Sequence, residues 1–342
     1  MATSSRSSAA AGKASQPKRF GSETPRIFTP PLRPLTRETS RGFECIEFAE
    51  EVLDIQLLPW QKWLLIHALE LLEDGTFRFR YIVLLVARQN GKSTLMTVLS
   101  LWRMYVDGAP LIIGTAQNLD VAEEQWQTAV DIAEAIPELA AEIAESGGIV
   151  KVNGKKTLKL TSGERYKVQA ASRRGGRGLS GDLVLLDELR EHQAWDAWAA
   201  VTKTTIAKAF AQIWAASNAG DASSIVLRFL RKLAHLALGD PDGINETGIT
   251  EDPAEIVIDD DEDDDAEPFV DDEDSLGIFE WSAPPGCAIN DRNGWAQANP
   301  SLGYTIREKE LASAARTDPE WVFRTECLCQ WSEGTLEGPF PP

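Results

Sequence analysis

Tyr81-Ile-Val-Leu-Leu-Val86 and the following Ala87-Arg88-Gln89-Asn90-Gly91-Lys92-Ser93-Thr94 decide the fold. The first part is short, apolar and rich in β-branched residues, which is typical of a strand buried on both faces of a parallel sheet. A helical pattern over Ser93–Tyr105 follows it. Gly-Lys-Ser between a buried strand and a helix predicts a phosphate-binding loop. Amides at the helix N-terminus face the anion, the lysine reaches the β- and γ-phosphates, and the hydroxyl binds Mg²⁺.

One position departs from the general phosphate-loop pattern. That pattern carries a glycine five residues before the Gly-Lys pair, and Val86 occupies the position here. The alternative interpretation is a tripeptide that merely begins a helix. The apolar strand before it favours phosphate binding, so we expect ATP to be bound by Arg88, Gln89, Asn90, Gly91, Lys92, Ser93 and Thr94.

A second motif is the apolar run Leu183–Leu186, which ends in Asp187 and Glu188. At the end of a strand, Asp187 would lie beside a bound Mg²⁺, and Glu188 would polarise a water for in-line attack on the γ-phosphate. The alternative is a strand end with two solvated acids. Because the pair follows a candidate phosphate loop by about ninety-five residues, the two motifs together indicate a nucleoside triphosphatase.

Two smaller features fit the same chemistry. Pro59-Trp60-Gln61 lies upstream of the loop, where the Gln61 amide would read the adenine edge; the alternative is a helix-start proline with a core tryptophan. The stretch Gln212–Gly220 looks like a strand that ends in Ser217 and Asn218, which would sense the γ-phosphate. As an ordinary exit from a strand, the two residues would have no such role.

A glycine-rich basic segment precedes the Asp187 strand and reads Arg173-Arg174-Gly175-Gly176-Arg177-Gly178. Such a loop grips phosphate backbones or lends an arginine to a neighbouring subunit's active site. We therefore assign Arg173, Arg174 and Arg177 to DNA or to catalysis in trans. A surface loop without function is the alternative.

Strands and helices alternate along the chain, which favours a doubly wound α/β sheet. The expected strands are Tyr81–Val86, Leu111–Gly114, Leu183–Leu186 and Gln212–Ala215, and the expected helices are Ser93–Tyr105, Val121–Ile136 and Trp195–Phe210.

The net charge of −19 is spread unevenly over the 342 residues. Residues 251–274 hold fifteen acidic side chains and no base, whereas residues 1–41 carry eight bases against two acids, which leaves −10 for the rest. A nucleic-acid partner is neither shown nor excluded by this balance, because one basic loop can grip phosphates while the bulk stays acidic.

The hydropathy pattern argues against a membrane-spanning protein, and the cysteine pattern argues against a disulfide-stabilised or zinc-binding protein. The longest apolar run, Tyr81–Ala87, has seven residues, far fewer than the ~20 of a membrane-spanning helix, so we expect no membrane partner. The four cysteines form neither a disulfide framework nor a zinc-ligand pattern, and reduced thiols fit an intracellular chain.

These observations divide the chain into five segments. We expect a basic flexible tail at 1–41, a P-loop ATPase core at 42–250, an acidic disordered insertion at 251–275, a lid subdomain at 276–335 and the end of a linker at 336–342.

The motif set resembles the ATPase domain of the large terminase subunit of tailed bacteriophages. In that family the phosphate loop characteristically lacks the first glycine and carries an arginine before Gly-Lys, which matches Val86 and Arg88. The resemblance covers about residues 43 to 333, and no single motif decides it. The matching pieces are Pro59-Trp60-Gln61, residues 87–94, Gly114-Thr115-Ala116-Gln117-Asn118, Arg177-Gly178 with Leu183–Glu188, Ala216-Ser217-Asn218 and Ala298-Asn299-Pro300-Ser301-Leu302-Gly303.

The resemblance implies a RecA-like P-loop NTPase sheet flanked by helices, with a small lid subdomain. It implies an ATP-hydrolysing motor that packages double-stranded viral DNA into procapsids. The implied assembly is a homo-oligomeric ring docked on the portal protein, with a small terminase subunit that recognises the DNA. Such a motor works in the cytoplasm of the infected bacterial host and is not retained in the virion.

By position, the resemblance also implies roles for the site residues. Lys92 would bind phosphates, and Arg88 would sense or stabilise the γ-phosphate. Ser93 and Asp187 would hold Mg²⁺, and Glu188 would act as the catalytic base.

In the same family, the residues at Ser217 and Asn218 would couple hydrolysis to DNA movement. Two features depart from the family: no chain remains for its C-terminal nuclease, so we expect no nuclease activity from this chain alone, and the acidic insertion has no counterpart. The rival interpretations are another nucleic-acid ATPase such as a helicase, and a non-hydrolysing subunit that binds ATP only to hold a ring together.

Overall fold

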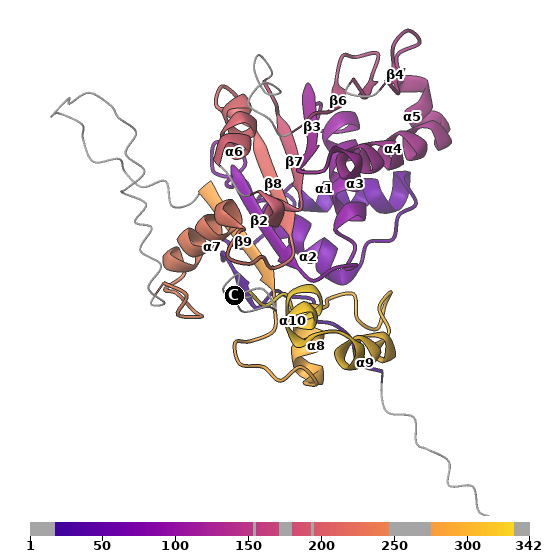
Figure 1. Cartoon of the computed structure of the whole chain (residues 1–342). Coiled ribbons are helices and arrows are strands. Elements are labelled where there is room, and N and C mark those ends of the chain that lie inside the picture. The colour runs from indigo at the N-terminus through magenta and orange to yellow at the C-terminus, as the bar shows by residue number, and fades with distance from the viewer. Residues whose placement is uncertain (1–17, 153–154, 171–179, 193–194, 246–274, 332–342) are drawn as a thin grey trace, which may run out of the picture.

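A mixed β-sheet forms the centre of the molecule in the computed structural model, which describes residues 18–152, 155–170, 180–192, 195–245 and 275–331. In these residues the sheet has nine strands in the order β1-β9-β2-β8-β7-β3-β6-β5-β4. Figure 1 shows the strands with helices on both sides. The strands are β1 (Ile27–Phe28), β2 (Tyr81–Val86), β3 (Leu111–Ala116), β4 (Ile149–Val150), β5 (Thr157–Lys159), β6 (Arg165–Val168), β7 (Leu183–Asp187), β8 (Gln212–Ser217) and β9 (Leu276–Trp281).

The six strands from β9 to β6 run parallel, and antiparallel pairs add β1 at one edge and β5 and β4 at the other. Leu85 of β2 is in register with Ser217 of β8, and Ala216 with Asp187 of β7. The carboxyl ends of β2, β8 and β7 therefore meet at one edge. Ligands of open α/β sheets bind at such an edge.

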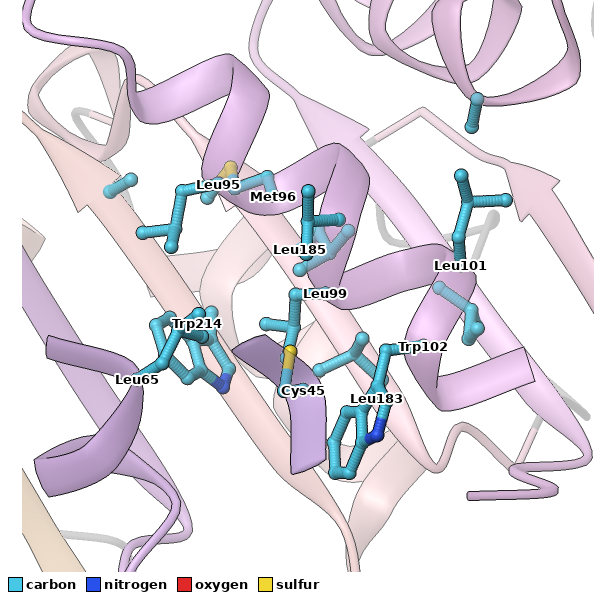
Figure 2. Packing of buried hydrophobic residues seen from close by; sticks show 14 of the residues in the cluster. Cys45, Leu65, Leu95, Met96, Leu99, Leu101, Trp102, Leu183, Leu185 and Trp214 are labelled. Atoms are coloured by element: carbon cyan, nitrogen blue, oxygen red, sulfur yellow. The ribbon is translucent and has the colours of Figure 1, made fainter. Parts of the chain in front are cut away.

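Both faces of the sheet are covered because its central strands are apolar throughout. Ile82, Leu84 and Val86 pack on one face with α1 to α4, whereas Val83 and Leu85 pack on the other with α6 and α7. Figure 2 shows the first face, where Leu95, Leu99 and Trp102 of α3 meet strand residues such as Leu185 and Trp214. The core helices are α1 (Gly42–Glu47), α2 (Pro59–Ala68), α3 (Lys92–Tyr105), α4 (Leu119–Ala135), α5 (Pro137–Glu142), α6 (Trp195–Thr202) and α7 (Ile225–Ala237), with short turns η1 (Phe48–Val52), η2 (Leu189–Glu191) and η3 (Lys203–Thr205).

Three further helices, α8 (Arg292–Ala298), α9 (Glu308–Thr317) and α10 (Glu320–Leu328), form a small subdomain with its own core, in the region of the predicted lid, and we call it the lid. Trp295 and Phe323 are fully buried there, with ring centroids 5.9 Å apart. Figure 1 shows these helices grouped beyond the end of the sheet. In the part of the chain that is described, no helix is both long and apolar enough to cross a bilayer.

The predicted start of the lid at residue 276 is wrong. Residues 276–281 are strand β9, which lies between β1 and β2 in the main sheet. This strand is hard to recognise in the sequence because Glu280 lies within it, and a central strand does not normally carry a carboxylate. The charge of Glu280 is buried against Arg231 of α7 at 2.7 Å.

The predicted flexible tail is wrong for residues 18–41. Ile27 and Phe28 form β1, Arg26 makes a bidentate ion pair with Asp242, and the Gly21 amide donates to Leu302 of the lid. Residues 1–17 lie outside the described part of the chain, as do 251–274 of the predicted insertion and 336–342 of the predicted linker end.

The expected helix 195–210 ends early, at Thr202, and continues as the 3₁₀ turn η3. Thr204 and Thr205 are buried, and the Thr205 hydroxyl donates to the Thr202 carbonyl at 2.8 Å. Threonine side chains compete in this way with the helical backbone. The run of β-branched residues therefore stops the helix.

Candidate active site

The predicted phosphate loop lies between β2 and α3. Gly91 is the N-cap of α3 at φ +93°, Gln89 is also left-handed at φ +59°, and no side chain caps the helix. The first amides of α3 therefore remain available to an anion. Gln89, Ser93 and Thr94 are exposed at the rim of the loop.

Lys92 runs inward from the start of α3. Its Nζ donates to the Val86 carbonyl at 3.4 Å. Desolvation lowers the pKa of Lys92, although the charge of Asp187 opposes the shift. A phosphate group would restore the favourable environment for this ammonium charge.

Asp187 ends β7 and is buried, with its Oδ1 accepting from the Glu188 amide at 2.9 Å. Burial raises the pKa of Asp187, and the charge of Lys92 partly offsets the rise. Asp187 and Ser93 both border a cavity of about 390 Å³, next to Thr94 and Thr97 of α3 and Gln125 of α4. The carboxylate and hydroxyl oxygens are ligands of the kind that Mg²⁺ prefers, so the residues fit the predicted metal.

Glu188 has a left-handed backbone, at φ +53° and ψ +48°. This conformation is uncommon for a residue with a side chain, and such outliers concentrate at functional sites. Its Oε1 lies 3.6 Å from Nη2 of Arg88, which follows the phosphate loop's strand. The structure thus brings the two predicted catalytic residues together from separate strands.

Arg88 projects from the loop with 56% of its side chain exposed. Besides Glu188 it contacts Glu326 of α10, with Nε 3.2 Å from Oε2. Few contacts hold the guanidinium, and its two partners are both carboxylates. It is placed to exchange one of them for a phosphate oxygen.

Glu326 and Arg190 belong to the site and were missed in the sequence. Glu326 Oε1 lies 2.7 Å from Nη1 of Arg190, and its Oε2 accepts from Asn218 at 3.2 Å. Arg190 follows Glu188 by two residues, and this nearness to the motif is the signal that could have indicated it. Glu326 carries no such signal, because it lies far along the chain in the lid.

The predicted coupling residues Ser217 and Asn218 are both buried at the end of β8. Ser217 Oγ accepts from the Arg190 amide at 3.1 Å. The pair therefore touches the segment that carries Glu188 on one side and, through Asn218, the lid on the other.

Gln61 lies under the phosphate loop. Its Nε2 donates to the Gly91 carbonyl at 3.0 Å, and its Oε1 accepts from the Leu58 amide at 2.8 Å. Contact between Gln61 and adenine stays a prediction, and these bonds also give the residue a role in holding the loop.

Asn90 is buried, and its side chain joins the loop to the lid. Nδ2 lies 3.1 Å from Asn299 Oδ1, and from the Ala87 and Arg88 carbonyls, while Oδ1 accepts from the Ser301 amide at 3.0 Å. Its amide hydrogens are fully used by these contacts. If Asn90 binds ATP as predicted, its backbone and not its side chain makes the contact.

The predicted arginines Arg173, Arg174 and Arg177 lie outside the described residues.

Comparison with known proteins identifies the fold to which this site belongs. No protein-family model and no curated protein sequence matches the chain. Among solved structures, the large terminase of bacteriophage HK97 is similar, with a TM-score of 0.65 and 21% identity over 85% of this chain and 55% of that one. The large terminase ATPase domain of Thermus phage P74-26 gives a TM-score of 0.52 and 15% identity over 82% of this chain and 96% of that domain.

The chain thus spans about half the length of the HK97 protein. At these identities the likeness concerns the fold, and it confirms the fold class that the resemblance implies. The chain has the RecA-like P-loop fold of large terminase ATPase domains.

Proposed function

We propose that this chain hydrolyses ATP to move double-stranded DNA into a viral procapsid. One observation carries the proposal. The phosphate loop after β2 and the Asp187-Glu188 pair at the end of β7 meet at the same sheet edge, with Arg88 3.6 Å from Glu188. The fold that terminase ATPase domains share supports the same function.

In the proposed reaction, Lys92 and the first amides of α3 bind the β- and γ-phosphates. Glu188 accepts a proton from the attacking water, and Arg88 stabilises negative charge on the transferred phosphoryl group. Ser93 and Asp187 would hold Mg²⁺, which when bound supplies positive charge against the phosphate oxygens.

The cavity beside Ser93 and Asp187 has room for part of the nucleotide beyond its phosphates. It measures about 390 Å³ and combines apolar walls from Ile55, Val121 and Ile132 with the buried Gln125 amide. Mixed linings of this kind suit a nucleoside, which is apolar on its faces and polar at its edges.

We further propose the partners that the packaging function requires. These are double-stranded DNA, a small terminase subunit, the portal protein of the procapsid and other copies of this chain in a ring, all in the cytoplasm of an infected bacterial host. Arg173, Arg174 and Arg177 are proposed to contact DNA or to enter a neighbouring active site.

Phosphate release from ATP, measured with and without double-stranded DNA, tests the proposal. Release that increases with DNA is the expected result, followed by ATP-dependent protection of DNA inside purified procapsids. Binding without release would assign the chain to non-hydrolysing assembly subunits. Strand displacement from a partial duplex would assign it to helicases.

A further inference from the structure

The outer face of α7 carries a row of apolar side chains. The members recur at intervals of three or four residues and so lie along one side of the helix: Ile225, Phe229, Leu233 and Leu236. Leu233 is 44% exposed and Leu236 is 61% exposed. Single exposed apolar residues are normal on a protein surface, but a continuous row along a helix indicates an interaction surface.

Two cations border this row. Arg228 and Lys232 each precede a member of the row by one residue, which places both along the same side of it at 3.6 residues per turn. The opposite side of α7 packs into the core through Val226, Leu227 and Leu230. Figure 1 shows α7 at the outside of the molecule, beside β9. The outer face is therefore apolar with a positively charged border, and it suits an occupant that combines apolar side chains with acids.

The segment that follows α7 in the chain has this composition. Residues 251–274 hold fifteen acidic side chains and no base. Within them, Ile256-Val257-Ile258 is an uninterrupted apolar triplet, with Glu255 before it and seven consecutive acids, residues 259–265, after it. A second copy of this chain that presented the same α7 face would bring positive charge to positive charge. The triplet and its flanking acids match the face in both respects.

The chain connection lets the triplet reach α7. The Asp240 amide donates to the His235 carbonyl at 2.7 Å, and the Asp240 carboxylate accepts from the amides of Ile244 and Asn245, both at 3.0 Å. Asn245 is thereby held close to the C-terminal end of α7. The eleven residues from Asn245 to Ile256 span up to about 40 Å when extended, whereas a helix of 13 residues is only about 20 Å long. The whole outer face is within reach.

We propose that Ile256-Val257-Ile258 docks on the outer face of α7, with its flanking acids next to Arg228 and Lys232. The docked triplet covers the apolar row and keeps other chains from it, so the acidic insertion acts as an intramolecular cover for this helix. For the triplet, the proposal departs from the disorder predicted for the insertion. It does not depend on the proposed ATP hydrolysis.

The rate at which a thiol in the triplet is modified tests the proposal in the full chain. Val257→Cys places the thiol in the triplet, and Ala266→Cys places one elsewhere among the acids of the same segment as the matched control. A docked thiol reacts only after it leaves the helix. We therefore expect Val257→Cys to react about tenfold or more slowly than Ala266→Cys, because burial of a single aliphatic side chain already provides an equilibrium of that size.

Two references make the rates comparable. The wild-type chain, treated in parallel, gives the contribution of the four native cysteines. Rates in concentrated urea, where nothing is docked, correct for the intrinsic reactivity of each thiol. Equal corrected rates at Val257→Cys and Ala266→Cys would overturn the proposal.

Changes on α7 identify the surface that protects the thiol. Leu233→Ser together with Leu236→Ser should raise the Val257→Cys rate to that of Ala266→Cys, whereas Leu32→Ser, at another exposed leucine, should not. Circular dichroism checks that the double variant folds. If it does not, Leu236→Ser alone serves, because Leu236 is the most exposed member of the row. Protection that persists in the folded variant would overturn the docking on α7.

Protein concentration and salt distinguish the occupants. Protection that is constant over about a hundredfold dilution is the expected result, because the triplet and the helix belong to one chain. Protection that is lost on dilution would assign the face to a second copy and overturn the proposal. About 1 M salt should weaken the protection by screening the attraction between the acids and the border of Arg228 and Lys232. Protection that salt does not affect would overturn the role given to these charges.

Discussion

Glu188 combines an uncommon backbone with a specific neighbour. A non-glycine residue in the left-handed region costs on the order of 1–3 kcal/mol, and packing must hold it there. At Glu188 this conformation turns the chain directly after β7, and the Glu188 carboxylate lies near Arg88. A change at this residue is therefore expected to affect chemistry without removing the nucleotide site.

Glu188→Gln is expected to retain ATP binding while turnover falls by about 10²-fold or more, the range seen on loss of a general base. Lys92→Ala is the companion change and should weaken nucleotide binding itself, because it removes the ammonium that reaches the phosphates. Phosphate release and binding of a fluorescent ATP analogue measure the two effects. Near-normal turnover in Glu188→Gln would refute the assignment of the base.

Arg88→Lys tests whether the guanidinium does more than supply a positive charge. A lysine ammonium cannot reproduce the planar fork that stabilises a transferred phosphoryl group. We expect most of the activity to be lost while nucleotide affinity stays within about threefold, since Lys92 and the loop amides remain. Arg88 is exposed, so the melting temperature should not change. Full activity in the lysine variant would mean that the guanidinium of Arg88 has no specific role in the reaction.

The sequence predicts positions best where a residue lies at the end of an apolar strand. Lys92 follows β2, Asp187 ends β7 and Glu188 follows it, and the parallel register brings those strand ends together, while the roles of these residues stay predictions. Glu326 could not be predicted in this way, because its contacts with Arg88 and Arg190 span more than a hundred residues and depend on where the lid docks.

At the scale of elements, apolar strands were predicted well and strands with charges were not. β2, β3, β7 and β8 were all recognised, although β3, β7 and β8 extend one or two residues further, into Ala116, Asp187 and Ser217. β9 was not among the predicted strands, and its apolar run carries the carboxylate of Glu280. Only the folded structure shows Arg231 neutralising that carboxylate.

The contact between the phosphate loop and the lid depends on a few buried hydrogen bonds. Ser301 donates its hydroxyl to the Asn90 carbonyl at 2.8 Å, and the same oxygen accepts from Trp60 Nε1 at 3.2 Å. Asn90 and Trp60 are themselves buried. The loop, α2 and the lid are thus joined through one hydroxyl.

Ser301→Ala should lower the free energy of unfolding by about 1–3 kcal/mol, because it leaves buried polar groups on Asn90 and Trp60 without partners. Urea unfolding followed by tryptophan fluorescence measures the change. Ser313→Ala on α9 is the control, since Ser313 is exposed and its hydroxyl makes no hydrogen bond with the residues that the structure describes. Equal stability of the two variants would contradict the proposed link.

At the scale of the whole molecule, the described residues do not provide the metal-binding carboxylates that a nuclease needs. A two-metal nuclease needs several carboxylates that converge on ions about 3.5–4 Å apart. The described chain has one cluster of potential metal ligands, His235 with Asp242 and Glu280. Arg26 lies 2.6 Å from Asp242 and Arg231 lies 2.7 Å from Glu280, so arginine side chains already neutralise the carboxylates of this cluster.

This chain is therefore expected not to cut supercoiled plasmid in the presence of Mg²⁺ or Mn²⁺. Gel electrophoresis after incubation measures the conversion of supercoiled to nicked DNA. A known endonuclease at equal concentration provides the positive control. Nicking that co-purifies with the chain and disappears in an acidic-residue variant would contradict the expectation.

The placement of β9 has a consequence for synthesis on the ribosome. β2 lies between β8 and β9, but about 195 residues separate Val86 from Trp281. At roughly 5–20 residues per second, this gap corresponds to on the order of 10–40 seconds of translation. During that interval the apolar β2 has an unpaired edge, and exposed edges of this kind promote association between chains. The nascent chain must therefore shield its future nucleotide-binding strand until the last strand of the sheet emerges.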